Sequence, residues 1–217
     1  MILKVKNLSI KYQNNVIFND INLSVSDSDL VVIKTGVSDG STSLLKALYG
    51  NTQYVSGSLH FNNNDVMSLS RKDINRIKSQ IGFVYEQAGL ISIYNILDNI
   101  ILPLHYHALE NKDNVEVVHQ VAEDFNVQHL LMREPSELSD VEIRLINLVR
   151  AILMKPKLLL VDELGGGMSE SFEKNIINKI LAYQSQIGFA IVLTTTLEQI
   201  GFGTQQYQIK DRSLVRL

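Results

Sequence analysis

The stretch Leu30–Gly50, "LVVIKTGVSDGSTSLLKALYG", decides the fold. An apolar run, a short loop with two glycines and a segment that stops at Gly50 predict a buried strand, a phosphate-binding loop and a helix. A functional loop of this kind reads G-x-x-x-x-G-K-[ST]. Here Gly36 and Gly40 are one residue too close together, and Ser41 stands where the lysine is expected. The stretch therefore predicts a nucleotide-binding fold whose phosphate loop is altered.

The composition narrows the class of protein. The 217 residues are 45% hydrophobic and 20% charged, which is typical of one globular domain with room for a subdomain. A net charge of −3 without a strongly basic patch argues against nucleic acid as a partner, and the absence of cysteine excludes thiol chemistry. No apolar run reaches the roughly 18 residues of a membrane span, and the N-terminus lacks a signal-peptide profile. We therefore expect a cytoplasmic protein.

The rest of the chain alternates between strand and helix patterns. Ser70 and Asp73 have capping-box spacing for a helix that runs to about Lys78. Asp211-Arg212 marks the turn of a C-terminal hairpin. The remaining predicted elements are strands at 2–12, 16–25, 57–63, 81–85, 157–163 and 189–196, a helical region at 95–153 and a helix around 176–181. This order predicts an α/β domain with a helical insert.

Several stretches in this order resemble the ATP-binding subunit of ABC transporters over almost the whole chain. The resemblance is closest to the group that serves lipoprotein release, phospholipid trafficking and cell division. It implies a P-loop NTPase-like ABC core with an antiparallel β subdomain (1–85 and 154–217) and a helical subdomain (about 86–153) in one domain, 1–217. The stretches that carry it are "KYQNNVIFNDINLSV" (11–25), "SGSLHFNNNDVMSLS" (56–70), "IGFVYEQAGLISIYNILDNIILPL" (81–104) and "PSELSDVEIRLINLVRAILMKPKLLLVDE" (135–163).

The resemblance also implies roles for the positions that it retains. Asp162 and Glu163 stand at the Walker B positions, where the first binds Mg²⁺ with Thr42 and the second polarises the attacking water. We expect Glu163 to be a catalytic remnant. The nucleotide contacts that the resemblance implies are Tyr12, which would stack on adenine, and Gly36, Gly40, Ser41, Thr42, Ser43 and Ser139.

Most other functional positions of the family have changed in this sequence. Besides Ser41, the changes are Glu86 for the glutamine that senses the permease, Asp140 within the signature "LSDVE" (138–142), Ser169 for the D-loop aspartate, and Thr196 for the switch histidine. We therefore expect ATP and Mg²⁺ to bind weakly or not at all.

Physical chemistry supports that expectation. Loss of a charged lysine hydrogen bond removes roughly 1.5–3 kcal/mol. A carboxylate such as Asp39, placed ~5 Å from a phosphate, costs about 3 kcal/mol at an effective dielectric constant near 20. At the signature, Ser139 and Glu142 have the spacing of a capping box, and Asp140 adds a charge favourable to the helix dipole but not to a phosphate.

Each of these residues also has a plainer interpretation. Tyr12 could serve packing alone, and Asp162-Glu163 could be structural. Lys34 could replace the lost lysine, although a solvated lysine is the better interpretation. His105 and His107 are interpreted as surface histidines rather than metal ligands. The segment 165–167, "GGG", is interpreted as a flexible loop.

Three functional hypotheses follow. The first is a degenerate nucleotide-binding subunit that docks on an integral membrane permease through about Ile91–Leu104, pairs with a second nucleotide-binding subunit and lies at the inner face of the cell membrane. The alternative is a slow but genuine ATPase that powers transport of lipid, lipoprotein or small molecules. The third is a soluble module that acts away from membranes. The apolar segment favours the first two, and the lost ligands favour the first over the second.

Overall fold

The computed structural model describes residues 1–13, 15–36, 39–51, 54–85, 89–107, 114–198 and 201–217. The described strands form a smaller antiparallel sheet, in the order β2-β1-β4-β5, and a larger sheet, in the order β10-β9-β3-β8-β7-β6. The smaller sheet comprises β1 (Leu3–Tyr12), β2 (Asn15–Val25), β4 (Tyr54–Phe61) and β5 (Asn64–Asp65). The larger comprises β3 (Leu30–Lys34), β6 (Ile81–Val84), β7 (Leu158–Val161), β8 (Ala190–Thr195), β9 (Gln205–Lys210) and β10 (Ser213–Arg216).

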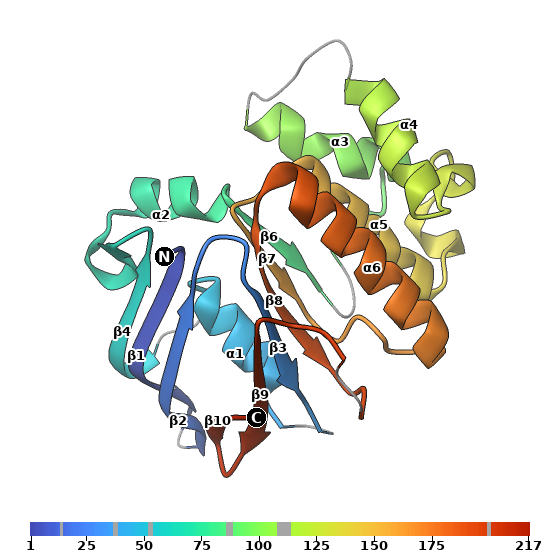
Figure 1. Cartoon of the computed structure of the whole chain (residues 1–217). Helices are drawn as coiled ribbons and strands as arrows, with labels where there is room; N and C mark the ends of the chain where they lie inside the picture. The colour runs from blue at the N-terminus through green and yellow to red at the C-terminus, as the bar shows by residue number, and fades with distance from the viewer. Residues whose placement is uncertain (14, 37–38, 52–53, 86–88, 108–113, 199–200) are drawn as a thin grey trace.

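Helices cover the larger sheet on both sides (Figure 1). The strands of this sheet pair in parallel except β9 with β10, as expected for an α/β core. In Figure 1, α1 and the smaller sheet lie on one face, and α5 and α6 lie on the other. The helices are α1 (Ser41–Leu48), α2 (Arg71–Lys78), α3 (Ile96–Tyr106), α4 (Asn114–Asp124), α5 (Asp140–Leu153) and α6 (Glu170–Ile187), with 3-10 turns at Val66–Ser68, Gln128–Leu130 and Pro135–Glu137.

The alternation of side chains along the central strands builds two cores. In β3, Leu30 and Val32 point to the core under α5 and α6, whereas Val31 and Ile33 point to the core shared with α1 and the smaller sheet. The β7 residues divide between the two cores in the same alternating way. Because both faces are buried, these strands read as continuous apolar runs in the sequence.

The predicted fold class is confirmed, with differences at the ends of elements. The strand expected at 157–163 stops at Val161, because Glu163 has a φ of 40°, which a strand does not accommodate. The strand expected at 57–63 spans Tyr54–Phe61, because Asn62 and Asn63 have φ of 48° and 65° and form a turn. Helices α3, α4 and α5 fall within 86–153; the division of the chain into subdomains at those bounds stays a prediction. In the part of the chain that the structure describes, no helix combines the length and apolarity of a membrane span.

Candidate nucleotide site

The nucleotide positions gather at one edge of the larger sheet. Strands β3, β8 and β7 are parallel neighbours, so the loops after them leave the sheet at the same edge. The loop after β3 leads into α1, Asp162 follows β7, and Thr196 follows β8. Ligands bind at this edge in open parallel sheets. The fold therefore brings together the loop, the acidic pair and the switch position that the sequence predicts.

The phosphate loop is occupied by the chain's own carboxylate. Asp39 accepts hydrogen bonds from the backbone N–H of Gly36 at 2.6 Å (Oδ2) and of Ser41 at 3.1 Å (Oδ1). Ser41 is the first residue of α1, so the carboxylate takes a free N–H at the positive end of that helix. These are two of the groups that would otherwise be offered to a phosphate. The loop thus carries a carboxylate of its own on two of its backbone N–H groups.

Gly40 shows why the loop keeps its second glycine. Its φ is 88°, and a Cβ atom there would lie 2.8 Å from Cγ2 of Ile17 and 3.1 Å from the Phe18 ring. Only glycine fits this left-handed and crowded position. At Gly36, by contrast, a Cβ atom would meet nothing within 4 Å. Conformation and packing therefore account for Gly40 without a ligand.

The acidic pair after β7 keeps a constrained geometry. Asp162 is 1% exposed, and the Thr194 hydroxyl lies 3.4 Å from its Oδ1. The same hydroxyl accepts the backbone N–H of Glu163 at 2.8 Å. Glu163 itself is half-buried in a left-handed conformation, which is costly for a residue other than glycine. The catalytic role of Glu163 stays a prediction, because other non-glycine residues of this chain, such as Lys155 and Ser28, also have a positive φ.

The start of α5 is closed by its own side chains. Ser139 caps the helix: its Oγ accepts the N–H of Glu142 at 3.3 Å, and its own N–H donates to Glu142 Oε2 at 2.8 Å. The backbone hydrogen bond from Ser139, followed by that of its hydroxyl, lowers the pKa of Glu142. Asp140 is exposed in the first turn. The capping box expected from the sequence is present, and a carboxylate occupies the helix start where the family presents bare amides.

Ser139→Ala should lower stability with or without nucleotide. The loss of an N-cap hydroxyl costs about 1 kcal/mol, which lowers the melting temperature of a chain of this size by about 2–4 °C. Thermal unfolding followed by circular dichroism measures the melting temperature of the variant and of wild type, each with and without ATP. A variant with unchanged stability and lower ATP affinity would instead make Ser139 a nucleotide ligand.

The other predicted positions are placed as follows. Tyr12 is 67% exposed at the end of β1. Thr42 and Ser43 are half-buried in the first turn of α1. Ser169 caps α6 by accepting the N–H of Phe172, and Thr196 is exposed. Glu86 lies outside the described residues.

The structure also describes Lys34, His105 and His107, for which the sequence predicts no role in binding. The ammonium of Lys34 donates to the Glu198 carbonyl at 3.4 Å and is not bound in the phosphate loop. His105 is exposed, and His107 is half-buried at the rim of a cavity described below. Among the described residues, no three His, Cys, Asp or Glu side chains are grouped as a metal site.

Three features of the described residues bear on nucleotide binding. The two loop N–H groups bind Asp39, no lysine stands at position 41, and the α5 start carries Asp140 and Glu142. Thr42 and Asp162 remain suitable oxygen ligands for Mg²⁺, but magnesium in such sites also depends on the phosphate oxygens of its substrate. Mg²⁺ would therefore bind at Thr42 and Asp162 only together with a nucleotide.

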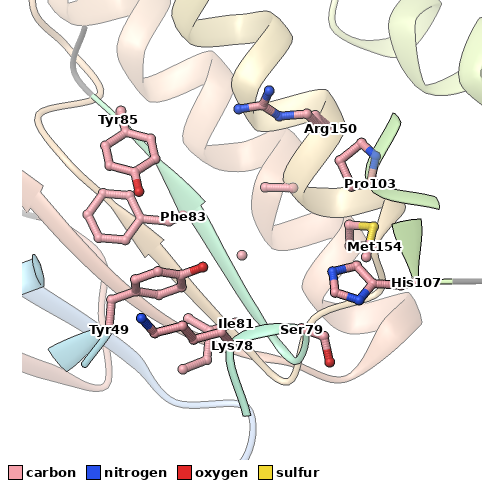
Figure 2. Close-up of a pocket in the computed structure, with 12 residues that line it drawn as sticks. Tyr49, Lys78, Ser79, Ile81, Phe83, Tyr85, Pro103, His107, Arg150 and Met154 are labelled. Atoms are coloured by element: carbon pink, nitrogen blue, oxygen red, sulfur yellow. The ribbon is translucent and has the colours of Figure 1, made fainter. Parts of the chain in front are cut away.

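A second feature lies away from this edge, and sequence reasoning missed it. A cavity of about 210 Å³ is bordered by aromatic rings on one wall and by α3 and α5 on the other (Figure 2). Phe83 and Tyr85 stack with ring centroids 4.2 Å apart, and Tyr49 packs edge-on to Phe83 at 5.4 Å. The cavity residues are Tyr49, Lys78, Ser79, Ile81, Gly82, Phe83, Tyr85, Pro103, His107, Arg150, Ala151 and Met154.

The cavity is cationic although the chain is acidic overall. Lys78 lies 5.1 Å from the ring centroid of Tyr49, and burial lowers its pKa. Burial also lowers the pKa of Arg150, whose guanidinium donates to the carbonyl of Gly89 at 2.5 Å and to Oδ1 of Asn147 at 2.8 Å. None of the cavity residues just named is acidic. The lining just named thus contains two basic side chains, Lys78 and Arg150, and no carboxylate.

The predicted docking segment is only partly a surface. Ile96, Ile100 and Leu104 are buried in the core, so they are not available to a partner; docking through about Ile91–Leu104 stays a prediction for the exposed positions of the segment. The exposed part is the turn before α3, where Ile93 is 82% and Tyr94 39% exposed. A helical segment alternates between core and surface, and a continuous apolar run in the sequence conceals that alternation.

Asn99 holds this exposed turn in place. Its side chain is 1% exposed; Oδ1 accepts the N–H of Ile91 at 2.6 Å, and Nδ2 donates to the carbonyls of Ile91 and Tyr94, each at 3.0 Å. One amide side chain therefore satisfies the backbone of the turn. The apolar side chains of Ile91, Ile93 and Tyr94, hereafter the apolar turn, are presented on a fixed backbone.

The sequence is similar to a known protein family and to individual proteins. A protein-family model described as "ABC transporter" matches residues 18–164. The chain is 28% identical over 200 residues to the lipoprotein-releasing system ATP-binding protein LolD of Buchnera aphidicola, covering 90% of this chain and 88% of that protein. It is 26% identical over 210 residues to the methionine import ATP-binding protein MetN of Campylobacter jejuni, covering 89% of this chain. The chain spans only 62% of the length of that MetN protein.

Solved structures share the fold. The dimeric structure of MJ0796, described as a bacterial ABC transporter cassette, superposes with a TM-score of 0.89 at 20% identity, over 98% of this chain and 96% of that one. A post-hydrolysis dimer of the same cassette, bound to ADP and Pi, gives a TM-score of 0.87, also at 20% identity and with the same coverage of both chains.

Proposed function

This chain belongs to the ABC transporter family, and from that premise we propose that it is a nucleotide-binding-type subunit with little or no ATP hydrolysis. It docks on a membrane permease at the inner face of the cell membrane and holds or regulates that permease. A second nucleotide-binding subunit, a copy of this chain or a different one, completes the pair. The relatives named above are import and lipoprotein-release proteins, which supports a transport context.

The observation that carries this proposal is the Asp39 carboxylate in the phosphate loop. It accepts the N–H groups of Gly36 and Ser41. A phosphate entering the loop would have to break both hydrogen bonds and approach a like charge. The capping box of Ser139 and Glu142 closes the signature helix in the same manner. Both halves of a composite ATP site are thus satisfied internally.

Docking rests on a different part of the molecule. The apolar turn is exposed on a backbone fixed by Asn99, and the cationic cavity is bordered by Pro103 of the same helix, α3. An amphipathic helix of the permease, with apolar side chains and one carboxylate, fits this combination. Neither surface contains a phosphate ligand, so docking survives the loss of ATP chemistry.

The alternative is a slow ATPase, and one observation favours it. Asp162 and Glu163 keep a strained, hydrogen-bonded arrangement at the edge where ATP would lie. Such an enzyme would transport lipid, lipoprotein or a small molecule with Glu163 activating the water.

Turnover measurements on the purified chain distinguish the two. We expect phosphate release at the level of a no-protein control, with no decrease on Glu163→Gln. The measurement is a coupled ATPase assay at millimolar ATP and Mg²⁺, repeated with the co-purified permease. Activity that scales with protein and disappears in Glu163→Gln would establish the slow ATPase instead.

A further inference from the structure

The loop after the acidic pair, which the sequence predicts to be flexible, packs closely against other side chains at Gly165 and Gly166. A Cβ atom at Gly165 would lie 1.9 Å from Oε2 of Glu173. At Gly166 it would lie 3.1 Å from Nη2 of Arg144. The φ of Gly165 lies outside the left-handed region, so space rather than backbone conformation requires glycine there. Because Gly165 and Gly166 lack a Cβ atom, the side chains of Glu173 and Arg144 can lie directly against the backbone of the loop.

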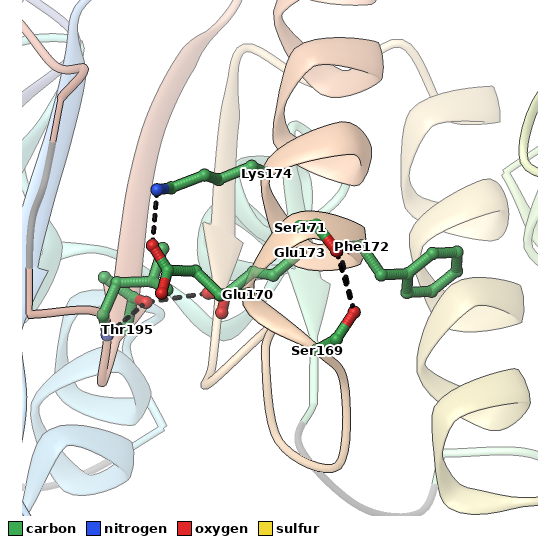
Figure 3. A network of polar contacts seen from close by, with 8 residues as sticks. Ser169, Glu170, Ser171, Phe172, Glu173, Lys174 and Thr195 are labelled. Carbon is green, nitrogen blue, oxygen red and sulfur yellow. Dashed lines mark hydrogen bonds and ion pairs between the residues drawn. The ribbon is translucent and has the colours of Figure 1, made fainter.

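Glu173 joins this loop to the end of β8. Its side chain is 3% exposed on α6, and Oε1 accepts the Thr195 hydroxyl at 2.7 Å (Figure 3). That hydroxyl also accepts the N–H of Leu197 at 3.1 Å, which fixes the chain on both sides of Thr196. The Thr195 carbonyl accepts the N–H of Thr35 at 2.9 Å, at the start of the phosphate loop. Glu173 contacts the glycine loop and Thr195, and the backbone of Thr195 in turn contacts the start of the phosphate loop.

Arg144 holds the other side of the same loop. It is 3% exposed on α5, and its Nη1 donates to the carbonyl of Leu164 at 3.3 Å and to that of Gly166. The glycine loop therefore lies between a buried carboxyl group from α6 and a buried guanidinium from α5. Contacts on both sides restrict it more than a surface loop of glycines would be restricted.

We propose that the carboxyl group of Glu173 is a latch that holds the loop 164–168 and the segment after β8 in one arrangement without nucleotide. Arg144 is the opposing positioning residue. The latch uses only side chains of this chain, so it operates whether or not ATP is hydrolysed. The loop 164–168 begins directly after Glu163, and the segment after β8 contains Thr196; these are the two positions at which the family's catalytic groups stand.

The titration of Glu173 gives the latch a measurable signature. Burial is the main cause of its raised pKa; Glu170 adds to the shift, whereas the Thr195 hydrogen bond, Arg144 and Lys174 oppose it. A raised native pKa means that the folded state holds the proton more tightly than the unfolded state. Stability from this group is therefore complete below the ordinary glutamate pKa and declines as pH rises through the native pKa.

A double-mutant cycle tests the packing. Gly165→Ala alone should lower the melting temperature by about 5 °C or more, because the new Cβ atom meets the carboxylate. In the Glu173→Ala background the same change should have less than half that effect, because the space is vacated. Gly201→Ala, where a Cβ atom meets nothing within 4 Å, is the matched control. Equal shifts in both backgrounds would overturn the latch.

A second variant keeps the test decisive if Glu173→Ala does not fold. Glu173→Gln keeps the shape and the acceptor for Thr195 but cannot titrate. Wild type should lose melting temperature relative to Glu173→Gln as pH rises from about 4.5 to 8, given the ordinary glutamate pKa of about 4.3. Hydrogen exchange of amides 164–168 should be slower in both proteins than in Gly165→Ala. Parallel melting curves, or fast exchange in wild type, would contradict the proposal.

Discussion

Ile93→Asp should release the chain from its membrane complex while leaving the fold intact. Ile93 is 82% exposed, so the unbound protein buries no new charge in the variant. In the docked complex, however, the carboxylate would replace an apolar contact at the centre of the apolar turn. Central apolar anchors contribute 2 kcal/mol or more to interfaces of this kind, so we expect a loss of affinity of about 30-fold or greater. Membrane fractionation and co-purification with the permease measure the loss.

The controls separate docking from folding. Val215→Asp changes an exposed apolar residue on β10, which lies at the opposite end of the molecule from α3 in Figure 1. It should stay with the membrane fraction. Ile93→Asp should keep the circular dichroism spectrum and melting temperature of wild type. If folded Ile93→Asp remains bound to the membrane, or if wild type is recovered wholly soluble and alone, the docking proposal is wrong.

Asp39→Ala combined with Ser41→Lys should raise ATP affinity by about 100-fold or more. Removal of the carboxylate frees the N–H groups of Gly36 and Ser41 and relieves a repulsion of about 3 kcal/mol. The lysine adds roughly 1.5–3 kcal/mol. Solvent screening and the shortened loop reduce the sum, because exposed charges interact less strongly than buried ones. Titration calorimetry with ATP and Mg²⁺ compares the variant with wild type.

The single variants and one control show which substitution accounts for the increase in ATP affinity. Each of Asp39→Ala and Ser41→Lys should give part of the increase, whereas Glu116→Ala, which removes an exposed carboxylate from α4, should give none. We expect no turnover in the repaired chain until Asp140 is also replaced, because the signature helix would still repel the γ-phosphate. Micromolar ATP affinity in wild type would falsify the view that Asp39 blocks the loop.

The sequence by itself determined the local features of this protein. The capping box at Ser139 and Glu142 and the hairpin turn at Asp211-Arg212 are present in the structure as expected. Each depends on residues within a few positions of one another, so its pattern is visible in the chain. The strand and the helix within Leu30–Gly50 were predictable for the same reason, and the order of segments identified the family.

Only the tertiary structure decided which side chains contact the backbone groups at the edge of the sheet where the predicted nucleotide positions lie. The sequence placed Asp39 in the phosphate loop, but the fold showed that its carboxylate accepts the loop's own N–H groups. The contact of Glu173 with Gly165 depends on how α6 packs on the sheet, and the cavity joins Tyr49 to Arg150 across about a hundred residues. Such contacts join residues that are far apart in the sequence, because the packing of helices against the sheet brings them together. They therefore have no fixed spacing and leave no periodic pattern in the sequence.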